Sequence, residues 1–222
     1  MTESIDPRRA RLFDAAQRLD LVLGEGDIDQ LLAYLDLLQR WNATYNLTAV
    51  RDPDRMLTQH VVDCLAVIPP LRRQLGSAAP RRLLDVGSGG GLPGVVIAIL
   101  NPSAINVTCV DTVGKKAAFV QQVAASLRLR NLHSQHARVE QMKASAFDVV
   151  TSRAFASLTD FVSLTRQHLA GDGIWLAMKG KDPVDERAAL PANIDVFHVE
   201  QLTVPGLDAE RCLVWMRPKP SL

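Results

Sequence analysis

Alternating or continuous apolar runs divide the second part of the chain into short strands. The expected strands occupy residues 82–86, 105–110, 147–151 and 173–179, followed by 194–203 and 211–217, and a short further strand is expected near 132–136. Strands that alternate with helical segments predict right-handed βα units and a parallel sheet. The last two runs are separated by a Pro-Gly turn at 205–206 rather than a helix, which predicts an antiparallel pair at one side of the sheet.

The pattern before this region is helical. Residues 1–22 are charged and amphipathic, and a capping box of Asp27 and Gln30 predicts the start of a second helix. A further helical region covers 56–75, with a break expected at Pro69–Pro70. We therefore expect a helical extension over residues 1–78 and an α/β core over residues 79–222.

The core begins with a glycine-rich segment, LLDVGSGGGLPG, at residues 83–94. An apolar run ends in an acid, a turn follows, and a new apolar run starts, which predicts a strand, a tight loop and a helix. Glycines allow positive φ angles and close approach of a ligand to the backbone. The start of the helix offers N–H groups without intrahelical partners. The segment predicts a pocket for a nucleotide-like cofactor.

Two cofactors fit this loop. Gly89, Gly91 and Gly94 satisfy the dinucleotide pattern G-x-G-x-x-G. Asp85, Gly87, Gly89 and Gly91 also satisfy D-x-G-x-G-x-G, a pattern of S-adenosylmethionine enzymes. A carboxylate close to the turn repels a pyrophosphate but is compatible with a sulfonium cofactor, so the second interpretation is favoured. A dinucleotide, or a glycine turn without a ligand, remains as an alternative.

Asp111 ends the second run, about twenty residues beyond the glycine turn, where βα units place a carboxylate against ribose hydroxyls. Its two oxygens suit a 2′,3′-diol. The alternative is an N-cap for a helix expected at 115–127.

Composition indicates a soluble enzyme of the cytoplasm. The chain has 222 residues, 47% of them hydrophobic, and a formal net charge of +1. Three scattered cysteines without a C-x-x-C pair indicate a reducing compartment and no metal cluster. The N-terminus lacks an apolar signal core. The longest apolar run, 92–100, is too short to cross a bilayer, so we expect no membrane association.

The segment after the fourth expected strand, 147–151, restricts which kind of atom the enzyme can methylate. Residues 152–157 read SRAFAS, whereas enzymes that methylate an exocyclic amine of a base carry N-P-P-Y or D-P-P-Y there. Methylation of pyrimidine C5 needs a thiolate, and Cys109 falls inside a strand. A target atom with its own lone pair fits better, attacking the methyl group directly without a general base.

Several motifs occur in a specific order: WN at 41–42, YNLT at 45–48, His60 with Asp63, the glycine segment, RVE at 138–140, SRAFAS, and KG at 179–180. Over residues 28–217 the chain resembles the glucose-inhibited division protein B family, the bacterial small-subunit rRNA guanine-N7 methyltransferases. The resemblance implies a Rossmann-like class I methyltransferase fold with seven strands, mostly parallel with an antiparallel last strand, S-adenosylmethionine as cofactor, and 16S rRNA or the small ribosomal subunit as substrate.

The resemblance also implies cofactor contacts, which add to those expected from the glycine segment and Asp111. It places them at Gly87, Leu92, Val139, Glu140 and Arg153. Asn46, Arg153 and Lys179 are candidates for positioning the substrate.

RNA binding requires local positive charge, for which Lys115, Lys179 and Lys181 are the preferred candidates. We expect a monomer. The alternatives are a methyltransferase for a small molecule or a protein, and a dinucleotide-dependent oxidoreductase.

Overall fold

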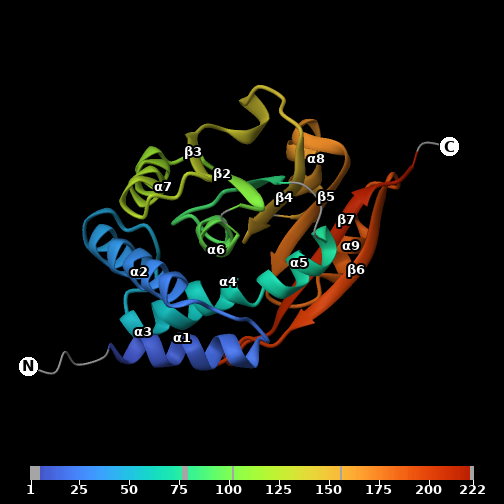
Figure 1. The fold of residues 1–222 in the computed structure, drawn as a ribbon. Coiled ribbons are helices and arrows are strands. Elements are labelled where there is room, and N and C mark those ends of the chain that lie inside the picture. The colour runs from blue at the N-terminus through green and yellow to red at the C-terminus, as the bar shows by residue number, and fades with distance from the viewer. Residues whose placement is uncertain (1–5, 77–79, 102, 156, 221–222) are drawn as a thin grey trace, which may run out of the picture.

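A seven-stranded sheet forms the centre of the molecule in the computed structural model, which describes residues 6–76, 80–101, 103–155 and 157–220 (Figure 1). Its strands are β1 (Arg81–Val86), β2 (Ile105–Asp111), β3 (Leu132–His136), β4 (Phe147–Arg153), β5 (Leu169–Lys179), β6 (Ile194–Leu202) and β7 (Arg211–Pro218).

The strand order is β3-β2-β1-β4-β5-β7-β6, and β7 runs antiparallel to both of its neighbours. The chain leaves β1 toward β2 and β3 and then returns to β4 on the other side. The carboxyl ends of β1 and β4 therefore flank the point where the strand order reverses, which is where open α/β sheets bind ligands. β5 begins earlier than the expected residue 173, at Leu169, and Gly173 lets the carbonyl of Phe147 come close, since a Cβ at Gly173 would lie 2.8 Å from that oxygen.

Helices and single turns connect and cover these strands. In chain order they are α1 (Pro7–Arg18), α2 (Glu25–Tyr45), α3 (Pro53–Met56), the π-helix η1 (Leu57–Val62), α4 (Asp63–Leu65), α5 (Ile68–Leu75), α6 (Gly94–Leu100), α7 (Gly114–Ser126), the 3₁₀ turn η2 (Val139–Gln141), α8 (Leu158–Thr165), the 3₁₀ turn η3 (Arg166–His168) and α9 (Val184–Ala188).

Two expectations for the helical extension were wrong. The capping box lies one turn earlier than expected: the Asp27 carboxylate accepts from the Gly24 N–H at 2.9 Å, so α2 starts at Glu25. Pro69 and Pro70 do not break a helix but lie in the first turn of α5, where a missing N–H breaks no intrahelical hydrogen bond. The first helix is confirmed over Pro7–Arg18, and residues 1–5 lie outside the described part of the chain.

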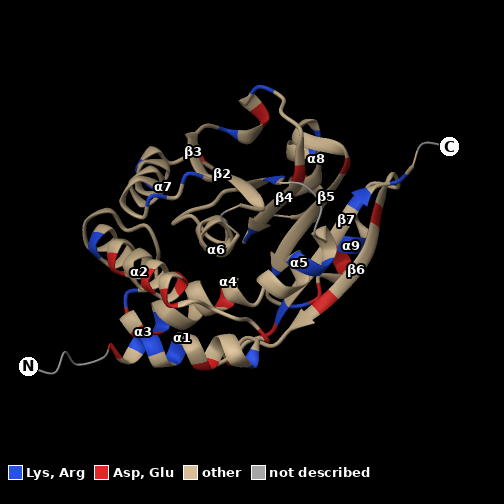
Figure 2. Cartoon of the chain, viewed as in Figure 1, with Lys and Arg blue, Asp and Glu red and all other residues tan. Residues whose placement is uncertain are grey.

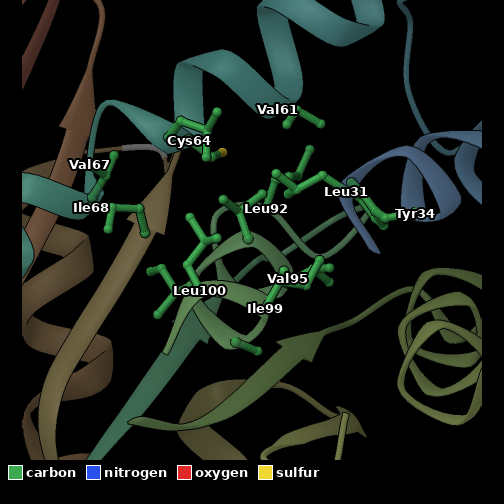
Figure 3. Close-up of a cluster of buried hydrophobic side chains, with 14 of the residues drawn as sticks. Leu31, Tyr34, Val61, Cys64, Val67, Ile68, Leu92, Val95, Ile99 and Leu100 are labelled. Atoms are coloured by element: carbon green, nitrogen blue, oxygen red, sulfur yellow. The ribbon is translucent and has the colours of Figure 1, made fainter. Parts of the chain in front are cut away.

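Alternate residues of the strands pack on opposite faces of the sheet. Leu83, Val107 and Val149 face α6, α7 and the N-terminal helices. Leu84 and Val150 face α8. Figure 3 shows side chains of α2, η1, α4 and α6 meeting in the first of these two clusters. The sheet thus has a core on each side, as the period of two along a strand requires.

The expected helical extension contributes to the first core rather than forming a core of its own. Leu12, Leu31 and Leu65 belong to the same cluster as the sheet residues. Ion pairs join α1 to its neighbours: Arg8 pairs with Asp36 at 2.6 Å, and Figure 2 shows basic and acidic segments side by side where α1 meets α2. The expected boundary between 78 and 79 falls at residues 77–79, outside the described part of the chain.

Candidate functional site

The glycine loop after β1 has a conformation that side chains would not permit. Gly87, Gly89 and Gly91 have φ angles of 65°, 60° and 84°. A Cβ at Gly91 would lie 2.5 Å from Cγ2 of Val95. A Cβ at Gly94 would lie 2.6 Å from a cysteine sulfur of β2. The last two glycines are therefore required by packing between the loop, α6 and the sheet.

Asp85 lies beneath this loop, fully buried. Its Oδ2 accepts a hydrogen bond from the Gly94 N–H at 2.8 Å, whereas Oδ1 has no hydrogen-bond partner among the described residues. Burial raises the pKa of this carboxyl to about 7, and the hydrogen bond from Gly94 opposes the rise. The expectation that the first N–H of the helix is open to a ligand is therefore wrong at Gly94, because Asp85 already accepts from it.

Asp111 joins the end of β2 to the loop. Its Oδ2 accepts from the Gly89 N–H at 2.9 Å and its Oδ1 from the Val113 N–H at 2.8 Å. The residue that caps α7 is Val113, so the alternative of Asp111 as the N-cap is wrong. Each carboxylate oxygen keeps a second lone pair, and the side chain lines a cavity.

Three neighbouring cavities lie along the carboxyl edge of the sheet. The Asp111 cavity, of about 380 Å³, is lined by residues from the ends of β1 and β2 and from η2. The glycine-loop cavity, about 160 Å³, shares Gly87 with it. The Lys179 cavity, about 440 Å³, shares His60, Arg153 and Ala154 with the glycine-loop cavity. Asp111 and Arg153 therefore line neighbouring cavities on the two sides of the glycine loop.

Val139 and Glu140 line the Asp111 cavity from the 3₁₀ turn η2. The first N–H groups of such a turn have no partner within it. Phe155, from the SRAFAS segment, lines the same cavity and packs against Phe161 with ring centroids 5.6 Å apart. Leu92 and Gly89 line the glycine-loop cavity. Gly91 lines none of the cavities described here.

A buried carboxylate organises the Lys179 cavity. Asp63 is 2% exposed and accepts from Arg153 Nη1 at 3.2 Å and from Arg211 Nε at 2.8 Å. Arg153 Nη1 also donates to the Gln59 carbonyl at 3.1 Å. Lys179 Nζ lies 2.8 Å from a carboxylate oxygen of Glu186 in α9. The cavity thus has more positive than negative side chains on its wall.

His60 lies in the π-helix, a rare helical form that is frequent at functional sites. Its Nε2 is 2.8 Å from the Thr48 hydroxyl, and burial lowers its pKa to about 4. The Nε2 atom of the ring thus pairs with Thr48 rather than with Asp63, which lies one helical turn further on.

The YNLT motif forms the wall of the glycine-loop cavity through Leu47 and Thr48. Asn42 holds this segment, accepting from the Thr48 N–H at 2.8 Å. Asn46 ends α2 in a left-handed conformation and accepts from Arg51 at 3.1 Å, outside the three cavities.

Several of these roles have no signal in the sequence. Arg211 lies outside the predicted motifs, and Thr48 entered only as part of YNLT. The helical region expected at 56–75 covers η1 and α4 but does not indicate the π-helical form. Among the described residues, no group of three or more His, Cys, Asp or Glu side chains can hold a metal ion. In the same part of the chain, no helix combines the length and apolar character needed to cross a bilayer.

Solved structures share this fold at low sequence identity. The ribosomal protein L11 methylase of Lactobacillus delbrueckii subsp. bulgaricus superposes with a TM-score of 0.53 at 14% identity, covering 76% of this chain and 80% of that one. A SAM-dependent methyltransferase of Aquifex aeolicus gives 0.53 at 15% identity, covering 74% and 93%. The predicted class I methyltransferase fold is confirmed.

Sequence relatives are much closer. Two proteins named ribosomal RNA small subunit methyltransferase G are 62% identical over 215 residues (Leptothrix cholodnii, 97% of this chain and 98% of that one) and 59% identical over 229 residues (Paracidovorax citrulli, 99% and 93%). The profile of the GidB family, rRNA small subunit methyltransferase G, matches residues 27–214. The predicted resemblance is confirmed, and this chain belongs to the rRNA small subunit methyltransferase G family.

Proposed function

We propose that this protein transfers a methyl group from S-adenosylmethionine to N7 of a guanine in small-subunit (16S) ribosomal RNA, acting as a monomer in the cytoplasm. Family membership and the methyltransferase fold support the reaction class. The observation that carries the proposal is the row of three neighbouring cavities from Asp111 to Lys179, in which Gly87 lines the first and second cavities and Arg153 the second and third.

The first two cavities suit the cofactor. The free lone pairs of Asp111 match a ribose diol, and the N–H groups at Val139 and Glu140 match the acceptors on an adenine edge. Gly87, Gly89 and Leu92 border the space beside them. When bound, S-adenosylmethionine supplies an electrophilic methyl group on a positively charged sulfur.

Asp85 and Gly91 have a different role in this proposal. Both are packed beneath or within the loop, and neither lines a cavity of the row. They fix the loop conformation, and so they act on the cofactor through the backbone of the loop.

The Lys179 cavity suits an RNA nucleotide. Arg153, Arg211 and Lys179 present positive charge at its wall, and Arg side chains bind phosphate with two parallel hydrogen bonds. Asp63 holds both arginines from the buried side. Asn46 does not line this cavity. In this proposal it acts indirectly: it ends α2, and the next two residues, Leu47 and Thr48, line the glycine-loop cavity.

The proposed transfer needs no general base. Guanine N7 has a lone pair and carries no proton, so it can attack the methyl group in line. Asp63, the carboxylate of the Lys179 cavity, already pairs with two arginines. Alignment of the two reactants then supplies the main acceleration, on the order of 7–11 kcal/mol.

Methyl transfer from labelled S-adenosylmethionine tests this function. The acceptors are purified small subunits, deproteinised 16S rRNA, bulk protein and metabolites. Borohydride reduction followed by aniline cleavage then locates N7-methylguanosine in the RNA. We expect label at one guanine, abolished by Asp111→Asn and retained by Asp172→Asn, an exposed control. Label in protein or metabolites, or at an atom other than N7, contradicts the proposal. Binding of NAD in place of S-adenosylhomocysteine supports the oxidoreductase alternative.

A further inference from the structure

The turn η2, which borders the Asp111 cavity, is hydrogen-bonded through two of its carbonyl oxygens to two consecutive side chains. His168 Nε2 lies 2.8 Å from the carbonyl oxygen of Val139. Gln167 Nε2 donates to the carbonyl oxygen of Glu140 at 3.0 Å. Both come from η3, which follows α8, so one short segment fixes two successive peptide groups of η2.

Only one neutral tautomer of His168 can make this hydrogen bond. The carbonyl of Val139 is an acceptor, so Nε2 must carry the hydrogen. The ring is fully buried, and its Nδ1 has no hydrogen-bond partner among the described residues. The side chain thus makes one directed hydrogen bond, to a residue that lines the cavity.

The segment that carries these side chains is itself anchored. The indole N–H of the buried Trp175 in β5 donates to the Thr165 hydroxyl at 2.8 Å. From the same helix, Leu164 lines the Asp111 cavity. The end of α8 therefore supports the turn and the cavity wall from a rigid position on the sheet.

We propose that Gln167 and His168 are positioning residues for adenine recognition, which rests on the proposed cofactor site. The Val139 carbonyl shares a peptide plane with the Glu140 N–H, so His168 fixes the direction of the N–H that faces the base. Gln167 holds the next peptide group, whose Gln141 N–H donates to the Arg138 carbonyl at 3.0 Å and closes the turn. An adenine edge presents N1 as an acceptor, whereas hypoxanthine carries a hydrogen there. A fixed N–H donor therefore favours binding of adenine over hypoxanthine. If the turn is less well fixed, this preference becomes smaller.

The variants remove one donor at a time with little change in volume. Gln167→Glu replaces the exposed amide by a carboxylate that cannot donate to a carbonyl. His168→Met replaces the buried ring by an apolar chain, and His168→Gln restores a donor of similar reach. Gln122→Glu is the matched control, because Gln122 is exposed on α7 and its amide donates to Ser126 instead.

Calorimetry with S-adenosylhomocysteine and S-inosylhomocysteine measures both affinity and base preference. We expect Gln167→Glu and His168→Met each to weaken S-adenosylhomocysteine binding about three- to tenfold, the loss of one hydrogen bond, and to reduce the preference for adenine. His168→Gln restores most of the affinity and most of the preference, and Gln122→Glu matches the unaltered protein. In all of these variants, we expect an unchanged rate at saturating cofactor and an unchanged KM for RNA.

Unchanged affinity and preference in Gln167→Glu and His168→Met overturn the proposal. Thermal melting identifies a variant that fails to fold, and if His168→Met does so, the exposed Gln167→Glu decides. A separate Asp111→Asn variant tests the cofactor site itself: if it binds S-adenosylhomocysteine normally, the site is misplaced, whatever the result for Gln167 and His168.

Discussion

Replacing Asp85 by asparagine should change how the free energy of unfolding depends on pH. The carboxyl is fully buried under the glycine loop, and one of its oxygens has no partner among the described residues. Asparagine can keep the hydrogen bond from the Gly94 N–H through its own oxygen. It cannot ionise, so the variant removes the titration and keeps the shape.

The sign and size follow from the pKa of Asp85, which burial raises from 3.8 to about 7. Below pH 3.8 the group is protonated in the folded and unfolded states alike. As the pH rises toward 7, the unfolded chain ionises and the folded one does not, so folding loses free energy. At about 1.4 kcal/mol per pH unit, the loss is about 4 kcal/mol and is complete once the pH exceeds the folded pKa.

Urea unfolding between pH 4 and 8 measures this difference directly. Subtracting the free energy of unfolding of Asp85→Asn from that of the unaltered protein cancels the other titrating groups, including His60. The difference should fall steadily to pH 7 and then level off. The exposed control Asp172→Asn should give a flat difference. Parallel curves for the unaltered protein and Asp85→Asn would falsify the assignment of a raised pKa.

Other predictions concern the loop and the arginine pair. Tyr34→Phe removes a hydroxyl that donates to the Gly90 carbonyl at 2.7 Å, so denaturation should show a loss of about 1 kcal/mol and calorimetry weaker S-adenosylhomocysteine binding. Gly91→Ala places a Cβ 2.5 Å from Val95 at a positive φ, which should lower stability by at least about 2 kcal/mol; an unchanged melting temperature contradicts the strain. Asp63→Asn leaves two partly buried arginines without their counter-charge, and thermal melting should show a loss of about 3 kcal/mol.

The strands and the glycine loop could be predicted because their signals are local. Apolar runs, alternating or continuous, indicated six of the strands, and the short polar strand β3 was expected between two helical segments. The turn between β6 and β7 predicted their antiparallel pairing. The glycine spacing identified the loop, since positive φ angles leave few other residues possible. Each of these signals lies within about ten residues of the chain, so no tertiary contact was needed to find it.

Contacts between distant segments could not be predicted in the same way. Asp63 pairs with Arg153 and Arg211, which lie 90 and 148 positions away, and nothing in its own segment indicates either partner. The role of Asp85 could not be read from its own segment for a related reason. An acid before a glycine turn has the same pattern whether it faces a ligand or the first N–H of the following helix.

The helical extension and the α/β core together form one site. Tyr34 and Leu38 of α2 reach the glycine loop, Thr48 lines the glycine-loop cavity, and Asp63 holds Arg153 at the end of β4. The extension therefore forms the side of the site that a bare sheet with its own helices leaves open. Because the loop is held by α2 on one side and by Asp85 and Asp111 on the other, its conformation does not depend on a ligand to be defined. A preformed loop reduces the ordering that binding requires. Asp63 also holds Arg153 at the wall of the Lys179 cavity.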